Sequence, residues 1–450
     1  MEVVSLILLA FSLILFFGFF AEWFFKKFSV PDVLFLIALG FIIGPFVLKI
    51  ISPSDLVSLA PVFTTFTLVF LLFDGAFNIS LPSLIREFSE SFVMTIFNFV
   101  ISSLIIAVIL WGFGFWVGGF SFLLSLLGGF MLGGVSSSFV IPILKQVKIS
   151  ERLYSLLALE SALTDVFCIV FSLTVIEIIK LGGFGIQNTL TQLVSLFAVA
   201  ILVGLIGGIL WIFLILRVFK EHNYMIAIAY LFLIYVVAEF LHGNGAIAAL
   251  FFGLILKNSK QLSSIIRGLL SNEAKEKKKA LKGELGVSVT TPSEEFFYHQ
   301  ISFLLKTFFF VYIGIMIDIS DWKAILIGVV LSIVLMFTRG ASSMLTKKML
   351  PESRLLVNAI FARGLAAAAI AQLAINAGVP HAYFISKIVF VTITGTILLS
   401  SIKVFLIKRR IPPVEEKESI GKVLEHKYKH FPKHHHLIKH KPKHKHKAKA

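Results

Sequence analysis

Long apolar stretches, most of about 20 residues, recur along residues 1–407 and alternate with short polar segments. A stretch of about 20 apolar residues is what a helix needs to cross the ~30 Å hydrocarbon layer of a bilayer. The pattern therefore predicts an all-α polytopic membrane protein with about thirteen transmembrane helices. We place these spans at 1–25, 31–50, 55–80, 89–117, 120–147, 151–180, 190–218, 223–241, 243–258, 298–319, 323–348, 353–377 and 381–407.

Composition agrees with this class of protein. Hydrophobic residues make up 58% of the 450-residue chain, and a single cysteine excludes a disulfide framework. The formal net charge of +16 could indicate a nucleic-acid partner. Its positive residues, however, concentrate in short loops, one long loop and the C-terminal tail, as in cytoplasmic segments that face anionic lipid. We expect a lipid bilayer and no nucleic acid as the partner.

The loop charges also predict an orientation. Loops after odd-numbered spans are rich in Lys and Arg, whereas loops after even-numbered spans carry only Lys49, Lys180 and Lys323. Positive loops stay in the cytoplasm, so the N-terminus is expected outside and the C-terminus inside a plasma membrane. Residues 259–297 are then a cytoplasmic loop. The His- and Lys-rich segment 411–450 is expected to be a disordered cytoplasmic tail.

Asp165 is the most informative single residue. It is a carboxylate in the middle of an apolar run, where loss of hydration costs several kcal/mol, and such groups usually mark an ion or proton path. Counted from the cytoplasmic ends of the spans, residues of both charges and three serines fall within one slab: Asp74, Ser136, Ser137, Ser138, Glu160, Asp165, Arg339 and Arg363.

Charges buried in lipid must pair. Glu160 and Arg339 lie at nearly the same depth, so they are expected to form an ion pair. Lys306 lies near the cytoplasmic end of its span, and we expect its side chain to snorkel to the surface instead of pairing with an acid.

Backbone breaks are predicted at the same level. Gly133, Gly134 and Pro142 surround the serines of the fifth span, and Gly364 follows Arg363 in the twelfth. Unwound backbone in a membrane is tolerated only around a cavity or binding site, and paired broken helices are typical of secondary transporters. If the seventh span is a connector, the breaks occupy matching positions in two inverted six-helix repeats.

Six motifs, in this order and spacing, resemble those of one family: LLFDGAFNIS at 71–80, GGVSSSFVIPILK at 133–145, LESALTD at 159–165, TFFFVYIGIMID at 307–318, MFTRG at 336–340 and ARGLAAA at 362–368. The chain is similar to the cation:proton antiporter superfamily, and most similar to its archaeal and bacterial NhaP-type sodium/proton exchangers. The resemblance implies a homodimer in which each chain has a core domain (spans near 55–180 and 298–377) and a dimerisation scaffold (near 1–50, 190–258 and 381–407). The fifth and twelfth spans would be unwound and cross near the ion site.

The resemblance also implies roles for single residues. Asp165 matches the family's ion-binding and proton-carrying aspartate, Ser161 a ligand one turn below it, and Asp74 an acid of the third span that approaches the ion. Glu160 and Arg339 match a structural ion pair, and Arg363 a positive residue close to the site.

Two positions depart from the family pattern. Thr164 stands where electroneutral members usually carry Asn and electrogenic members carry a second Asp. The Thr side chain does not take up and release a proton near neutral pH, so one exchanging carboxylate remains and one-for-one exchange is favoured. The fifth span lacks the Thr-Asp-Pro usual in NhaP-type members and offers Ser136, Ser137 and Ser138 as hydroxyl ligands.

We therefore expect a transporter, not an enzyme: an electroneutral Na⁺ (or Li⁺)/H⁺ antiporter of the elevator type, with no cofactor besides the transported ions. The first alternative is K⁺/H⁺ exchange or K⁺ efflux of the Kef type, whose members usually carry a large nucleotide-binding domain that the short tail does not match. The second is a sodium-coupled symporter of organic anions. ATP-driven transport and hydrolysis lack support, because the sequence contains no P-loop, dinucleotide-binding or metalloprotease motif.

Overall fold

The computed structural model describes residues 2–408, except for 29–30, 53–55, 57–59, 78–80, 148, 150, 181–185, 216–223, 263, 265–291 and 347–348. Side chains are described for a subset of these positions. The predicted tail at 411–450 and most of the predicted loop at 259–297 lie outside the described residues.

All regular secondary structure in the described part of the chain is helical, and this part contains no strand, as predicted. Six of its helices are long and apolar enough to cross a membrane, and several shorter apolar helices accompany them. The helices are α1 (Glu2–Phe28), α2 (Asp32–Ile43), α4 (Ala60–Phe77), α5 (Leu81–Val117), α6 (Phe122–Met131), α7 (Ser137–Gln146), α8 (Glu151–Lys180), α9 (Ile186–Leu214), α10 (Tyr224–Phe240), α11 (Gly245–Lys257), α14 (Pro292–Met316), α15 (Trp322–Thr338), η2 (Arg339–Met344), α16 (Pro351–Ala359), α17 (Leu365–Asn376) and α18 (Ala382–Lys408).

Two of the predicted spans are interrupted. The span near 120–147 consists of α6 and α7, and the span near 353–377 of α16 and α17. Between the halves, the backbone leaves the helical conformation over residues 132–136 and 360–364, where the glycines and serines occur. The two interruptions touch, because the Ser136 amide donates a hydrogen bond to the Ala362 carbonyl at 2.9 Å. The breaks therefore occur where the sequence predicts them.

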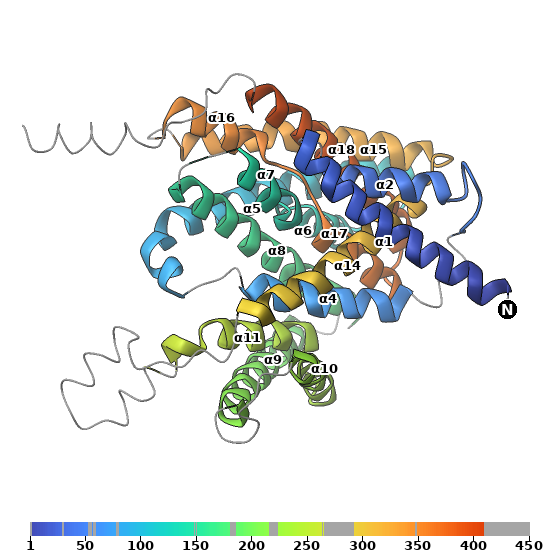
Figure 1. Cartoon of the computed structure of the whole chain (residues 1–450). Coiled ribbons are helices and arrows are strands. Elements are labelled where there is room, and N and C mark those ends of the chain that lie inside the picture. Colours follow the sequence, from blue (N-terminus) through green and yellow to red (C-terminus); the bar gives the residue numbers. More distant parts are fainter. Residues whose placement is uncertain are drawn as a thin grey trace, which may run out of the picture. The chain divides into compact units, whose positions relative to one another are not determined.

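The contacts between helices group them differently from the core and scaffold division given above. α18, expected in the scaffold, packs on α15 and α17. α14 and α4, expected in the core, pack chiefly on α2 and α11 respectively. We call α1, α2, α4, α9, α10, α11 and α14 the first helix group, and α5, α6, α7, α8, α15, α16, α17 and α18 the second (Figure 1).

Side chains explain this grouping. A cluster of buried residues joins α4 to α9, α10, α11 and α14, and it includes Phe70, Trp211, Leu231, Phe252 and Tyr298. α2 and α14 approach each other through glycines, since a Cβ at Gly40 or Gly314 would overlap the backbone of the other helix. Small residues allow such close packing between helices in a membrane.

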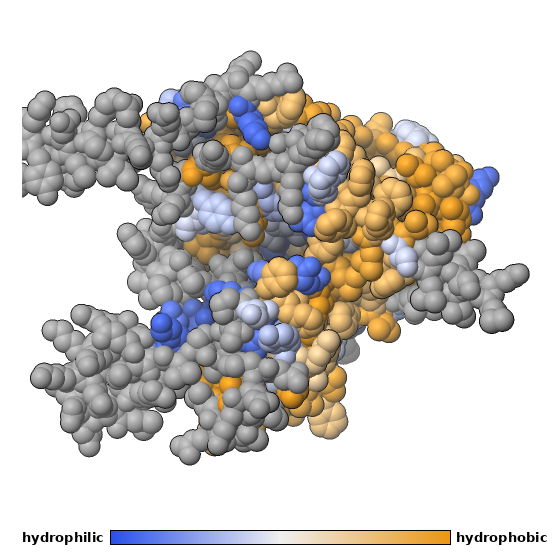
Figure 2. All heavy atoms as spheres, in the orientation of Figure 1, coloured by the Kyte–Doolittle hydropathy of each residue, from blue (hydrophilic) through white to orange (hydrophobic). Residues whose placement is uncertain are grey.

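The described surface is largely apolar where lipid would contact it. Figure 2 shows hydrophobic side chains covering the region of α1 and α2, and exposed residues there include Phe16, Phe19 and Trp23. Because water does not solvate such a surface favourably, it fits a bilayer environment.

Candidate functional site

A cavity of about 490 Å³ lies between the two helix groups. The first group contributes residues of α1, α4 and α14, and the second contributes residues of α7, α8 and the first residue of α17, Leu365. Asp165 of α8 lines this cavity together with Ser137 and Ser138 of α7 and Asp74 of α4. Four of the predicted site residues thus face one space.

The carboxylate of Asp165 is held at the N-terminus of the half-helix α7. Ser137 donates two hydrogen bonds to Oδ2 of Asp165, one from its hydroxyl at 2.6 Å and one from its backbone amide at 3.2 Å. The helix dipole places partial positive charge at this end of α7, which favours a carboxylate or another anion there. Among the described residues, Oδ1 of Asp165 has no hydrogen-bond partner and is available to a further ligand.

Asp74 lines the cavity on the opposite wall. Its Oδ1 lies 2.9 Å from Nδ1 of His299 in α14, and the side chain of His299 is half exposed. The imidazole of His299 and the carboxylate of Asp74 therefore meet at a more open part of the cavity. The carboxylate of Asp165, by contrast, is bonded to Ser137 where the broken helices cross.

Three predicted ligands, Ser136, Ser161 and Thr164, do not line the cavity. Ser161 is fully buried and donates to the Ala158 carbonyl of its own helix at 2.9 Å. The side chains of Ser136 and Thr164 are also buried, against the crossing of the broken helices. These residues lie beside Asp165 but face other neighbours, and their contact with the ion stays a prediction.

Thr164 instead holds the break between α6 and α7. Its hydroxyl accepts a hydrogen bond from the Val135 amide at 3.0 Å and lies 3.3 Å from the Val135 carbonyl oxygen. Nearby, the thiol of Cys168 accepts a hydrogen bond from the Gly134 amide at 3.0 Å. Unwinding frees backbone groups that must be satisfied in a membrane, and these two side chains of α8 satisfy them.

Arg363 also satisfies a backbone group in the break between α6 and α7. It is buried, and its Nη1 donates a hydrogen bond to the Gly134 carbonyl oxygen. It does not line the cavity with Asp165. The guanidinium thus offsets the negative end of α6, and its expected effect on a bound ion stays a prediction.

The second interruption is held by α18. The Arg363 amide donates to the Thr396 hydroxyl at 3.0 Å, and the Ser400 hydroxyl donates to the Ala359 carbonyl at 2.6 Å. Backbone groups freed in both broken helices thus find partners in neighbouring helices.

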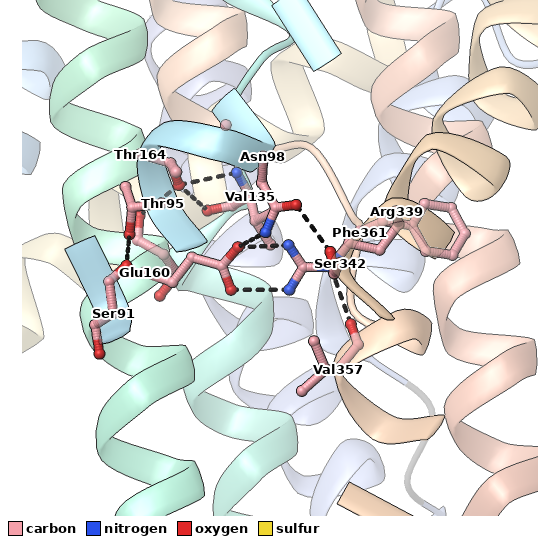
Figure 3. Close-up of polar contacts among 12 residues, drawn as sticks. Ser91, Thr95, Asn98, Val135, Glu160, Thr164, Arg339, Ser342, Val357 and Phe361 are labelled. Carbon is pink, nitrogen blue, oxygen red and sulfur yellow. Dashed lines mark hydrogen bonds and ion pairs between the residues drawn. The ribbon is translucent and has the colours of Figure 1, made fainter. Parts of the chain in front are cut away.

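Glu160 and Arg339 form a buried ion pair, drawn in Figure 3. Nη1 and Nη2 of Arg339 lie 2.5 and 2.8 Å from the two carboxylate oxygens of Glu160, and the side chains are 3% and 1% exposed. Asn98 of α5 donates to Glu160 at 2.7 Å and accepts from Ser342 at 2.8 Å. The network links α5, α8 and η2 away from the cavity, as a structural pair would.

Lys306 does not snorkel away from acids. Its Nζ lies 2.6 Å from Oδ2 of Asp32 in α2, and the two side chains are 14% and 6% exposed. The expectation of an unpaired lysine is therefore wrong. The reason is packing: α2 and α14 approach closely, so Asp32 at the start of α2 comes within reach of Lys306.

Asn98, Asp32 and His299 were not singled out in the sequence. Asn98 is a lone amide within an apolar span, which is a usable signal for a buried polar network. His299 and Lys306 are seven residues apart, so both lie on one face of α14. Asp32 follows Pro31 and reads only as the start of a helix.

Groups of three or more His, Cys, Asp or Glu side chains that could hold a resident metal ion do not occur in the described ranges. Asp165 and Ser137 offer carboxylate and hydroxyl oxygens, which suit hard cations. The arrangement is thus capable of holding a proton or a hard cation at one carboxylate.

Known proteins show the same architecture. The fold is similar to that of the sodium proton antiporter MjNhaP1 from Methanocaldococcus jannaschii, solved at pH 8, with a TM-score of 0.66, 22% identity, and coverage of 91% of this chain and 97% of that one. At this identity the likeness establishes the fold.

Two curated relatives are similar over part of their length. One is a probable Na⁺/H⁺ antiporter 3 from Methanocaldococcus jannaschii, 24% identical over 39% of this chain and 44% of that protein. The other is the Na⁺/H⁺ antiporter ApNhaP from Aphanothece halophytica, 31% identical over 42% of this chain and 36% of that protein. The matched stretch spans less than half of each relative.

A family model covers almost the whole described chain. The model of the transmembrane sodium/hydrogen exchangers matches residues 11–408, a range that includes the cavity, both interrupted helices and Asp165. The chain therefore belongs to the sodium/hydrogen exchanger family.

Proposed function

We propose that this protein exchanges Na⁺ or Li⁺ for H⁺, one for one, at the carboxylate of Asp165. The observation that carries the proposal is the position of this carboxylate: at the N-terminus of a half-helix, on the wall of a cavity of about 490 Å³ between two helix groups. The family membership and the names of the relatives support Na⁺ and H⁺ as the exchanged ions.

Competition at one carboxylate accounts for exchange. Ser137 occupies Oδ2 of Asp165, and Oδ1 is left for either a proton or a cation. A protonated carboxyl is a poor cation ligand, so binding of H⁺ and binding of Na⁺ exclude each other. Further oxygen ligands would come from the Ser137 and Ser138 hydroxyls and from water in the cavity.

We infer one-for-one stoichiometry from the neighbour of Asp165. Thr164 cannot ionise near neutral pH, and its hydroxyl is already engaged by the backbone of Val135. With Asp165 as the exchanging carboxylate, one proton moves in one direction and one monovalent cation in the other, which moves no net charge.

Alternating access requires the site to face each side of the membrane in turn. We propose an elevator-type movement, in which the second helix group carries Asp165 against the first group. The cavity supports this proposal because its walls come from both groups. Thirteen spans, two inverted repeats, a homodimer built on the first group, an external N-terminus and a plasma-membrane location complete the proposed arrangement.

The test is exchange in proteoliposomes with voltage clamped by an ionophore. Wild type should move H⁺ on addition of Na⁺ or Li⁺, without a dependence on voltage. Asp165→Asn should abolish exchange while the protein remains monodisperse and thermally stable. Exchange retained in Asp165→Asn would refute the proposal.

The same assay separates the alternatives. A response to K⁺ in preference to Na⁺ would favour a K⁺/H⁺ exchanger of the Kef type. Sodium-dependent uptake of an organic anion without proton movement would favour a symporter.

A further inference from the structure

Lys306 places a positive charge on the wall of the cation cavity. It lines the same cavity as Asp165 and Asp74, and it lies seven residues after His299, about 10 Å further along α14. An ammonium at such a place competes with the transported cation, because it is attracted to the same carboxylates and repels a second positive charge.

Asp32 is the residue that occupies this ammonium. Its Oδ2 lies 2.6 Å from Nζ, and the Asp32 side chain is only 6% exposed. Asp32 itself does not line the cavity, so its pull on Lys306 is directed out of the space where the cation would bind. The Phe303 ring, 5.9 Å from Nζ, lies beside the ammonium.

The position of Asp32 is fixed by helix packing. α2 and α14 approach until a Cβ at Gly40 or Gly314 would overlap the opposite backbone. Both partners of the ion pair therefore belong to closely packed helices of the first group, whereas Asp165 and Ser137 belong to the second.

We propose that Asp32 is a positioning residue for cation affinity: it holds the Lys306 ammonium away from Asp165 and Asp74, so that the cavity accepts an external cation. The inference rests on the proposed function. Without a charged partner at position 32, Lys306 is a nearly buried ammonium on the wall of a cavity that Asp165, Asp74 and Glu22 also line. A buried charge needs a partner, so the ammonium turns toward them and competes with Na⁺.

The experiment compares the Na⁺ dependence of exchange in four proteins: wild type, Asp32→Asn, Asp32→Glu and the double variant Asp32→Asn with Lys306→Gln. Asp32→Asn should raise the KM for Na⁺ by about tenfold and change the maximal rate much less, because a like charge within the cavity weakens cation binding without removing the carrier. Asp32→Glu keeps the negative partner and should retain a KM near wild type.

The double variant discriminates positioning from structural damage. Removing the ammonium together with its partner should return the KM to near the wild-type value. Asp32→Ser gives a second neutral variant in case Asp32→Asn is not recovered as folded protein.

Glu295→Gln is a matched control on the same helix. Glu295 pairs with Lys257 of α11 at 2.9 Å, and neither residue lines the cavity. This variant loses an ion pair of α14 and should leave the Na⁺ KM unchanged.

Failures of the two proposals are distinguishable. Absence of cation-driven proton movement in wild type would overturn the proposed function. Normal exchange in wild type with an unchanged KM in the neutral variants at position 32, or a raised KM that persists in the double variant, would overturn the role of Asp32.

Discussion

Arg339 at the start of η2 contacts both carboxylate oxygens of Glu160 in α8, at 2.5 and 2.8 Å, although 179 residues separate them in the chain. Asn98 and the Val357 carbonyl occupy further hydrogen-bonding capacity of the pair, the carbonyl accepting from Nε of Arg339 at 2.9 Å. A buried pair with such partners fixes how three helices meet, and Figure 3 shows it at their junction.

Glu160→Gln should therefore destabilise the protein strongly. Removing one partner leaves the Arg339 guanidinium buried without a counter-charge, which costs about 3 kcal/mol or more. We expect a clear fall in the thermal unfolding temperature in detergent. Glu177→Gln is the control, because Glu177 and Lys180 form a solvent-accessible pair at 3.0 Å and contribute little. Equal unfolding temperatures for Glu160→Gln and wild type would contradict a structural role.

Thr164→Val should destabilise the unwound segment between α6 and α7. Valine has nearly the same shape but leaves the Val135 amide without its partner, at a cost of about 1–3 kcal/mol. Thr164→Ser keeps the hydroxyl and should stay close to wild type in thermal stability and in exchange. A fully active and stable Thr164→Val protein would show that the hydroxyl is dispensable.

Asp318 should make stability depend on pH at the end of α14. Burial raises the pKa of Asp318, but hydrogen bonds from Ser320 and Lys387 outweigh burial and lower the pKa below its ordinary value of 3.8. Because the folded-state pKa is the lower one, ionised Asp318 stabilises the fold above the ordinary value, and this contribution is lost as the pH falls through the folded-state pKa.

The comparison is between wild type and Asp318→Asn by thermal unfolding over a pH series. Wild type should be the more stable protein at neutral pH, and the difference should shrink as the pH falls below about 4. A difference that stays constant over the whole series would contradict this origin of the stabilisation.

The interrupted helices and the cavity carboxylate were predictable from the sequence. Glycines mark both breaks, and an acid in an apolar run marks Asp165, because these signals are local. The direction in which neighbouring residues point was not predictable. Successive residues on a helix differ by about 100° in direction, so packing decides whether Thr164 or Asp165 faces the cavity.

Contacts between residues far apart in the sequence were also hard to predict. Asp32 and Lys306 are 274 residues apart, and their contact depends on how closely α2 and α14 pack. The pairing of Glu160 with Arg339 is predictable because loop charges give the orientation of the spans, and the orientation gives both residues nearly the same depth in the membrane. Lys306 has no such match, since Asp32 lies at a helix start where an acid is ordinary.

The crossing of the two interrupted helices has little spare hydrogen-bonding capacity. The amides and carbonyls of Gly134 and Val135 are engaged by side chains of α8 and by Arg363. The Ser136 amide bonds the Ala362 carbonyl, and the Ala359 carbonyl accepts from Ser400 of α18. A hinge needs backbone groups that are free to change hydrogen-bond partners, and at this crossing the backbone groups named above already have partners. The crossing should behave as a solid block, so motion during transport is to be sought where the two groups slide past each other.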